Sequence, residues 1–109
     1  MIARAVMTDP EMLLLDEPSA SLDLGARERL LQMLSGFAQS PSSPAMIMVT
    51  HHVEEIPPGF THVLLLRDGL VQASGPIAET LTAENLGAAF GIEFELTEQD
   101  GRYSAIARR

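Results

Sequence analysis

Two carboxylates and a histidine stand where apolar runs of this chain end. Asp16 and Glu17 follow the apolar run 12–15, and His51 comes just after the run 46–49. Runs this short predict strands that are buried on both sides in a parallel sheet. A carboxylate beside such a strand is costly unless a cation or hydrogen-bond donors compensate its charge, and Mg²⁺ is a natural partner. Because open α/β folds bind ligands at the carboxyl edge of the sheet, the three side chains predict a ligand site there.

Asp16 and Glu17 can act together only if the chain turns between them, because successive side chains on a strand point to opposite faces. Pro18 favours such a turn, since the residue before a proline takes extended geometry and proline donates no hydrogen bond to a sheet. In hydrolysis of a nucleoside triphosphate, Asp16 would hold Mg²⁺ through its water shell, and Glu17 would polarise the attacking water. Two plainer interpretations stay open: a solvated Asp-Glu pair, and a loop histidine bonded to a backbone carbonyl. His52 has no role in this scheme and is expected on the surface or at a helix start.

The neighbouring residues add a family resemblance. The segment 13–23 (Leu-Leu-Leu-Asp-Glu-Pro-Ser-Ala-Ser-Leu-Asp) resembles the Walker B strand, catalytic glutamate and D-loop of ATP-binding cassette (ABC) ATPases. Val49-Thr50-His51 resembles their switch-histidine loop. Residues 1–6 resemble the helix that follows the family's signature sequence, and Asp9-Pro10 resembles the turn into the Walker B strand. The resemblance covers nearly the whole chain and is specific over residues 1–70.

This resemblance implies a role for each matching residue. It makes Asp16 the Mg²⁺ ligand, Glu17 the general base, and His51 the sensor that bridges the γ-phosphate and Glu17. Ser21 and Asp23 would belong to the D-loop, which in this family crosses a dimer interface. ATP and Mg²⁺ are the implied cofactors, and the implied partners are a second ATPase subunit, as in a homodimer, and a membrane permease.

Other family motifs do not occur in the chain. There is no Gly-x-x-x-x-Gly-Lys phosphate loop (Walker A) and no Leu-Ser-Gly-Gly signature. Leu34-Ser35-Gly36 is only a chance partial match, because it follows the Walker B strand and lies in a predicted helix. The chain therefore resembles the carboxyl-terminal half of a nucleotide-binding domain, and we expect it to be inactive alone.

Composition narrows the class of protein. A length of 109 residues allows one small domain at most, and 46% hydrophobic residues suffice for a core. The absence of cysteine excludes disulfides and thiolate metal sites. A net charge of −8 argues against nucleic-acid binding through a basic surface. No apolar run approaches the roughly 20 residues that span a bilayer, so a cytoplasmic protein, peripheral at the inner face of the cell membrane through a permease, is expected.

The expected fold class is α/β, a partial P-loop NTPase of the ABC type, with a parallel sheet, flanking helices and carboxyl-terminal β-hairpins. Residues 2–7 are expected to end a helix, 12–16 to form a strand, and Asp23 to cap a helix over 24–39. That helix should bury Leu30, Leu34, Phe37 and Ala38, with Leu31 on the flank. A strand over 45–50 should run parallel to the first strand.

Shorter elements are expected after His51. They are a helical turn at 53–56, a strand pair 63–66 and 70–73 around an Asp-Gly turn, short helices through residue 90, and a hairpin of 93–97 with 102–107. The apolar residues of this tail should be core, namely Leu81, Leu86, Phe90, Phe94 and Leu96. Residues 1–75 are expected to be the catalytic half-domain, and 76–109 a family-specific extension packed on it.

Three functions from different classes follow. The first is an ATP-hydrolysing subunit of an ABC transporter, importer-like because 76–90 resembles the ending of ATPases for iron chelates and related cofactors. The second is a soluble ABC ATPase that acts on ribosomes or DNA. The third is a non-catalytic remnant or regulatory module that docks on an intact subunit through its D-loop face.

Overall fold

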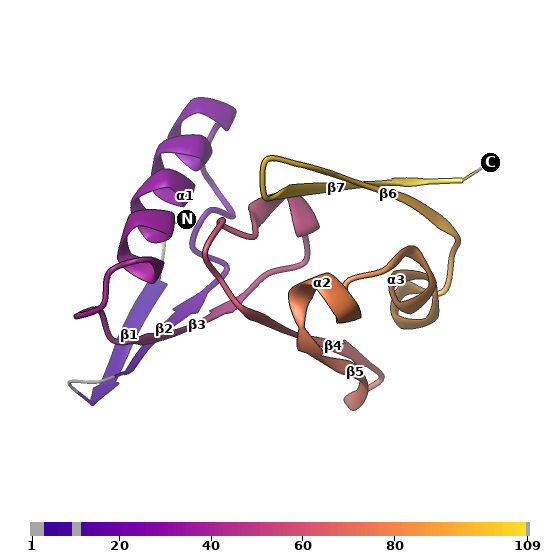
Figure 1. The fold of residues 1–109 in the computed structure, drawn as a ribbon, viewed down its shortest axis with the longest axis horizontal. Helices are drawn as coiled ribbons and strands as arrows, with labels where there is room; N and C mark the ends of the chain where they lie inside the picture. The colour runs from indigo at the N-terminus through magenta and orange to yellow at the C-terminus, as the bar shows by residue number, and fades with distance from the viewer. Residues whose placement is uncertain (1–3, 10–11, 109) are drawn as a thin grey trace. The chain divides into compact units, whose positions relative to one another are not determined.

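The computed structural model describes residues 4–9 and 12–108. Its elements fall into two compact units, Met1–Gly59 and Phe60–Arg109. The first unit holds one three-stranded sheet and a long helix, and the second holds two hairpins and two short helices (Figure 1). The α/β class predicted from the sequence is confirmed, whereas the division into 1–75 and 76–109 stays a prediction.

The sheet of the first unit has the order β1-β2-β3. β2 (Met12–Asp16) and β3 (Ala45–Val49) pair in parallel, as predicted. β1 (Arg4–Asp9) pairs antiparallel with β2, so the helix predicted over 2–7 is wrong for residues 4–7. A segment this short gains little as an isolated helix, while pairing satisfies the backbone groups along the free edge of β2. Residues 2–3 and Pro10 of the predicted Asp9-Pro10 turn lie outside the described residues.

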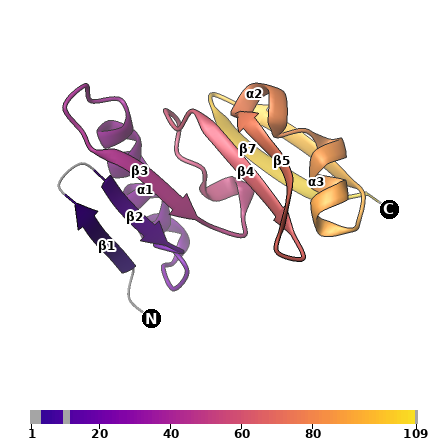
Figure 2. The same ribbon diagram turned by 90° about the horizontal axis from the view of Figure 1, so that it is seen from below.

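The helix α1 (Leu24–Ala38) connects the two parallel strands and covers one face of the sheet (Figure 2). Its start is confirmed: the Asp23 carboxylate accepts a hydrogen bond of 2.8 Å from the Ala26 amide. The buried stripe is centred on Leu31, 1% exposed, and Leu34. Phe37, predicted as core, is 50% exposed, and Leu30 and Ala38 are only half-buried. Leu34 is buried as predicted, but the centre of the buried face lies at Leu31 and not at Leu30, because adjacent leucines at 30 and 31 allow either phase.

The opposite face of this sheet is apolar and exposed in the described residues. On β3, Met46 and Met48 are half-buried, while Ile47 and Val49 are 51% and 44% exposed. On β2 only Leu15 is buried. The prediction that the strands are buried on both faces is therefore wrong, because α1 covers only one face of the sheet. Parallel sheets ordinarily have helices on both faces.

The second unit begins with the predicted Asp-Gly hairpin, β4 (His62–Arg67) and β5 (Leu70–Pro76). Asp68 and Gly69 have φ of 53° and 77°, which are the left-handed values that a two-residue type I′ turn requires. α2 (Ile77–Thr80) and α3 (Ala83–Phe90) pack against this hairpin, and α3 also contacts β6 (Phe94–Gln99). β6 pairs with β7 (Arg102–Ala107), as predicted.

The core of the second unit consists of aliphatic side chains, with Leu81 and Leu86 buried as predicted. The prediction that Phe90 is a core residue is wrong, because its side chain is half exposed. Phe90 instead contacts Phe94 edge to face, with a ring-centroid distance of 6.0 Å. Phe94 and Leu96 are only half-buried. Across the described part of the chain, the helices are too short or too polar to cross a membrane.

Candidate functional site

The carboxyl ends of β2 and β3 form the candidate site. Asp16 lies opposite Val49 in the parallel register, so both strands end at the same level. The Glu17 amide then donates a hydrogen bond of 2.8 Å to the Val49 carbonyl, one position beyond the regular pairing. The predicted meeting of the two segments at one sheet edge is therefore present in the backbone.

The turn after Asp16 centres on Glu17, whose φ is 47°. Extended geometry was expected before Pro18, so this expectation is wrong, although the predicted turn is present. The turn continues with hydrogen bonds from Ala20 to the Glu17 carbonyl and from Leu22 to the Ser19 carbonyl. A left-handed conformation costs an L-residue about 1–2 kcal/mol, and such positions concentrate at functional sites.

Glu17 and His51 face each other across this edge. Their closest atoms, Glu17 Oε2 and His51 Nε2, are 3.9 Å apart, and the side chains are 43% and 68% exposed. This distance is too long for a hydrogen bond, and exposed pairs of this kind stabilise a fold only weakly. The pair therefore contributes little to folding and leaves both polar groups accessible to a ligand. His52 is exposed at the N-cap of the short 3₁₀ helix η1 (Val53–Glu55), as expected.

Asp16 ends β2 with an exposed carboxylate. Among the residues that the structure describes, no three His, Cys, Asp or Glu side chains gather closely enough to form a metal cage. Mg²⁺ commonly keeps several waters and binds through one or two carboxylates together with substrate phosphates. An exposed carboxylate beside Glu17 fits that mode of binding.

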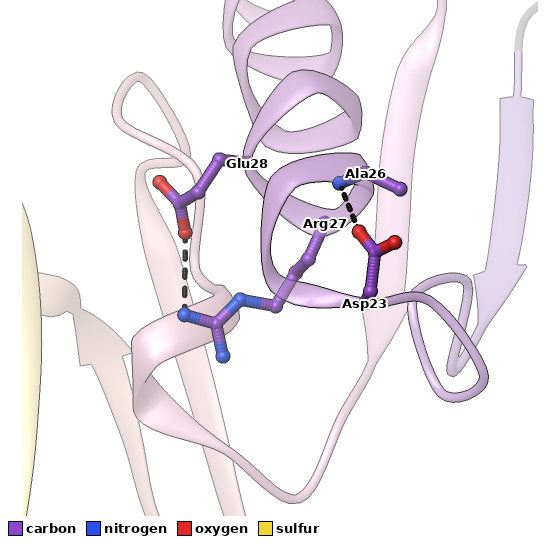
Figure 3. A network of polar contacts seen from close by, with 4 residues as sticks. All are labelled: Asp23, Ala26, Arg27 and Glu28. Atoms are coloured by element: carbon purple, nitrogen blue, oxygen red, sulfur yellow. Dashed lines mark hydrogen bonds and ion pairs between the residues drawn. The ribbon is translucent and has the colours of Figure 1, made fainter.

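The predicted D-loop residues lie on the turn before α1. Ser21 is exposed, and Asp23 is held by its cap on Ala26 (Figure 3). In the same turn of the helix, Arg27 Nη2 pairs with Glu28 Oε2 at 3.2 Å. Asp23 therefore caps α1, and it would keep this structural role if it also lay in a dimer interface. Ser21 is exposed to solvent.

Sequence analysis named Thr50 only as part of the Val49-Thr50-His51 motif and did not single out Glu55. Glu55 is buried, and its Oε1 accepts a short hydrogen bond from Thr50 Oγ1. Thr50 Oγ1 in turn accepts a hydrogen bond of 3.1 Å from the His52 amide. No local pattern separates Glu55 from its neighbour Glu54, so only the tertiary structure identifies it.

Comparisons with known proteins agree with this arrangement. No protein-family model matches the chain. It is 50% identical over 90 residues to an uncharacterized ABC transporter ATP-binding protein of Bacillus subtilis, YlmA, covering 83% of this chain and 34% of the relative. It is 40% identical over 111 aligned positions to the molybdenum import ATP-binding protein ModC of Pseudomonas aeruginosa, covering 96% and 30%.

The fold is also similar to that of a solved structure. It is described as an inward-facing conformation of a metal-chelate type ABC transporter, with a TM-score of 0.71 and 25% identity, covering 91% of this chain and 40% of the other. The chain spans about a third of the length of the curated relatives it matches.

Proposed function

Because the chain belongs to the ABC transporter ATP-binding proteins and matches their carboxyl-terminal part, we propose that it supplies the water-activating half of an ATPase site. The observation that carries this proposal is the approach of Glu17 to His51, 3.9 Å apart at the shared end of two parallel strands. An acidic pair that is merely solvated does not account for the histidine that the loop after β3 brings to within 3.9 Å of it. A loop histidine satisfied by a carbonyl would not need a glutamate in a left-handed turn.

The reaction divides among three side chains. Water attacks the γ-phosphorus of ATP, the bond to the ADP oxygen breaks, and Glu17 takes the proton of the attacking water. His51 holds the γ-phosphate and Glu17 in line with each other. Asp16 would hold Mg²⁺ through water, and the metal when bound would offset charge on the phosphate oxygens.

The partners follow from the same family. We infer that the D-loop residues Ser21 and Asp23 meet a second ATPase subunit, and that the complete protein acts at the cytoplasmic face of a membrane beneath a permease. The names of the molybdenum importer and the metal-chelate transporter support an importer for a metal-containing substrate. An iron chelate is our narrower proposal within that class.

The experiment joins this chain to the amino-terminal part of YlmA, replacing the matching region of that protein. We expect Mg-ATP hydrolysis by the chimera and none by the 109-residue chain alone. Glu17→Gln should lower kcat by about 10²–10⁴-fold, because general-base catalysis typically contributes a rate factor of that size. The variant should still bind ATP. Asp16→Asn should raise the Mg²⁺ concentration needed for turnover.

The adjacent histidines give a matched control. His51→Ala should abolish most turnover, while His52→Ala should leave kcat within about twofold. Equal effects of the two substitutions would contradict the role proposed for His51. Turnover by the chain alone would contradict the proposal that it supplies only half of the ATPase site.

A further inference from the structure

Three hydrogen bonds connect the two neighbours of His51 with the buried residue Glu55. Glu55 is 7% exposed, and its carboxylate accepts from the Thr50 hydroxyl. Its own amide donates to the His52 carbonyl at 3.0 Å, and the His52 amide donates to Thr50 Oγ1 at 3.1 Å. Thr50, His52 and Glu55 thus close a small polar ring around His51, whose side chain lies outside it and is 68% exposed.

We propose that Glu55 is a positioning residue for His51 and that it acts through Thr50. The inference rests on the proposed ATPase function and deepens it, because it adds a buried residue to the three side chains assigned to the reaction. The threonine hydroxyl is the essential link, since it accepts from one neighbour of His51 and donates to Glu55. Hydrogen bonds to a carboxylate are about twice as strong as neutral ones, and a buried carboxylate without them would be costly.

The far end of the same loop is anchored separately. Ser35 Oγ on α1 donates to the Pro58 carbonyl at 2.6 Å, and Gln39 Nε2 donates to Ser35 Oγ at 2.9 Å. Pro57 is fully buried, and a Cβ on Gly59 would lie 2.9 Å from Gln39 Cγ. The segment from Thr50 to Gly59 is therefore held by side-chain contacts at both ends, and the side chain of His51 lies exposed between them.

The loop contacts can be tested on the chain itself by hydrogen–deuterium exchange. Thr50→Val keeps the shape of the side chain but removes the hydroxyl, and Thr50→Ser keeps the hydroxyl. We expect exchange in the 50–56 segment to rise at least about tenfold in Thr50→Val and to change little in Thr50→Ser. α1 should keep its protection in both variants. Unchanged exchange at 50–56, or equal loss of protection in α1, would overturn the inference.

The catalytic consequence can be tested in the YlmA chimera. Glu55→Met and Thr50→Val should each lower kcat about tenfold or more with KM for ATP nearly unchanged, and Thr50→Ser should retain the wild-type rate. Combined with His51→Ala, neither substitution should lower kcat further, because the ring acts only through that histidine. Additive losses would overturn this inference alone. A wild-type chimera without turnover would overturn the proposed function and the catalytic part of this inference together.

Discussion

Replacing Glu17 tests whether the catalytic turn is strained. Glu17→Ala and Glu17→Gly both remove the carboxylate, but only alanine keeps a Cβ at φ of 47°. At an ordinary helical or extended position, the glycine variant is the less stable of the two. At this position we expect the order to reverse.

The size of the difference follows from two opposing terms. The left-handed conformation costs alanine about 1–2 kcal/mol, and glycine avoids that cost. Glycine loses about 0.5–1 kcal/mol more chain entropy on folding. The glycine variant should therefore be more stable by about 0.5–1 kcal/mol, which raises Tm by about 2–8 °C for a unit of this size.

Urea and thermal unfolding followed by far-UV circular dichroism measure the difference. The matched control is Gln32, an exposed residue inside α1, where glycine should be less stable than alanine by about 1 kcal/mol. A glycine variant at position 17 that is no more stable than the alanine variant, with the control behaving normally, would refute strain at this turn.

Three further predictions concern the first unit. Leu31→Ala should lower the free energy of unfolding by about 2–5 kcal/mol. Met33→Ala, on the same helix but 53% exposed, should lower it by under about 1 kcal/mol. Urea titration distinguishes the two variants. Asp23→Ala should cost about 1 kcal/mol through loss of the cap, while Asp23→Asn should stay near wild type in the same assay. The chain should associate through the sheet face that exposes Ile47 and Val49. The double substitution Ile47→Lys and Val49→Lys should therefore lower the average particle mass measured by light scattering. A monodisperse wild-type monomer would contradict this prediction.

The sequence was sufficient for the elements that build the site. Two apolar runs separated by a helix with Asp23 at its start predict a parallel strand pair, and parallel strands must end at one edge. That reasoning brings Asp16, Glu17 and His51 together without any coordinates. The Asp-Gly turns likewise predict both hairpins of the second unit from local chemistry alone.

The errors come from long-range contacts. Residues 4–7 have no strong local preference, and their pairing with β2 decides their structure. Leu30 and Leu31 are adjacent apolar residues on α1, and only packing against the sheet selects Leu31 as the buried one. Glu55 resembles any surface glutamate until the fold places Thr50 against it.

Exposed and half-buried side chains alternate along β3, and this pattern bears on the register in which β3 pairs with β2. Both faces of β3 are apolar, since Ala45 to Val49 contains no polar side chain. Hydrophobic patterning normally fixes register, because a slip of one residue exchanges the two faces, but here the exchange would swap one set of apolar residues for another. A slip by one position would also carry His52 to the level of His51. The hydrogen bond from the Glu17 amide to the Val49 carbonyl continues the pairing beyond the strands in the register in which His51, and not His52, meets Glu17.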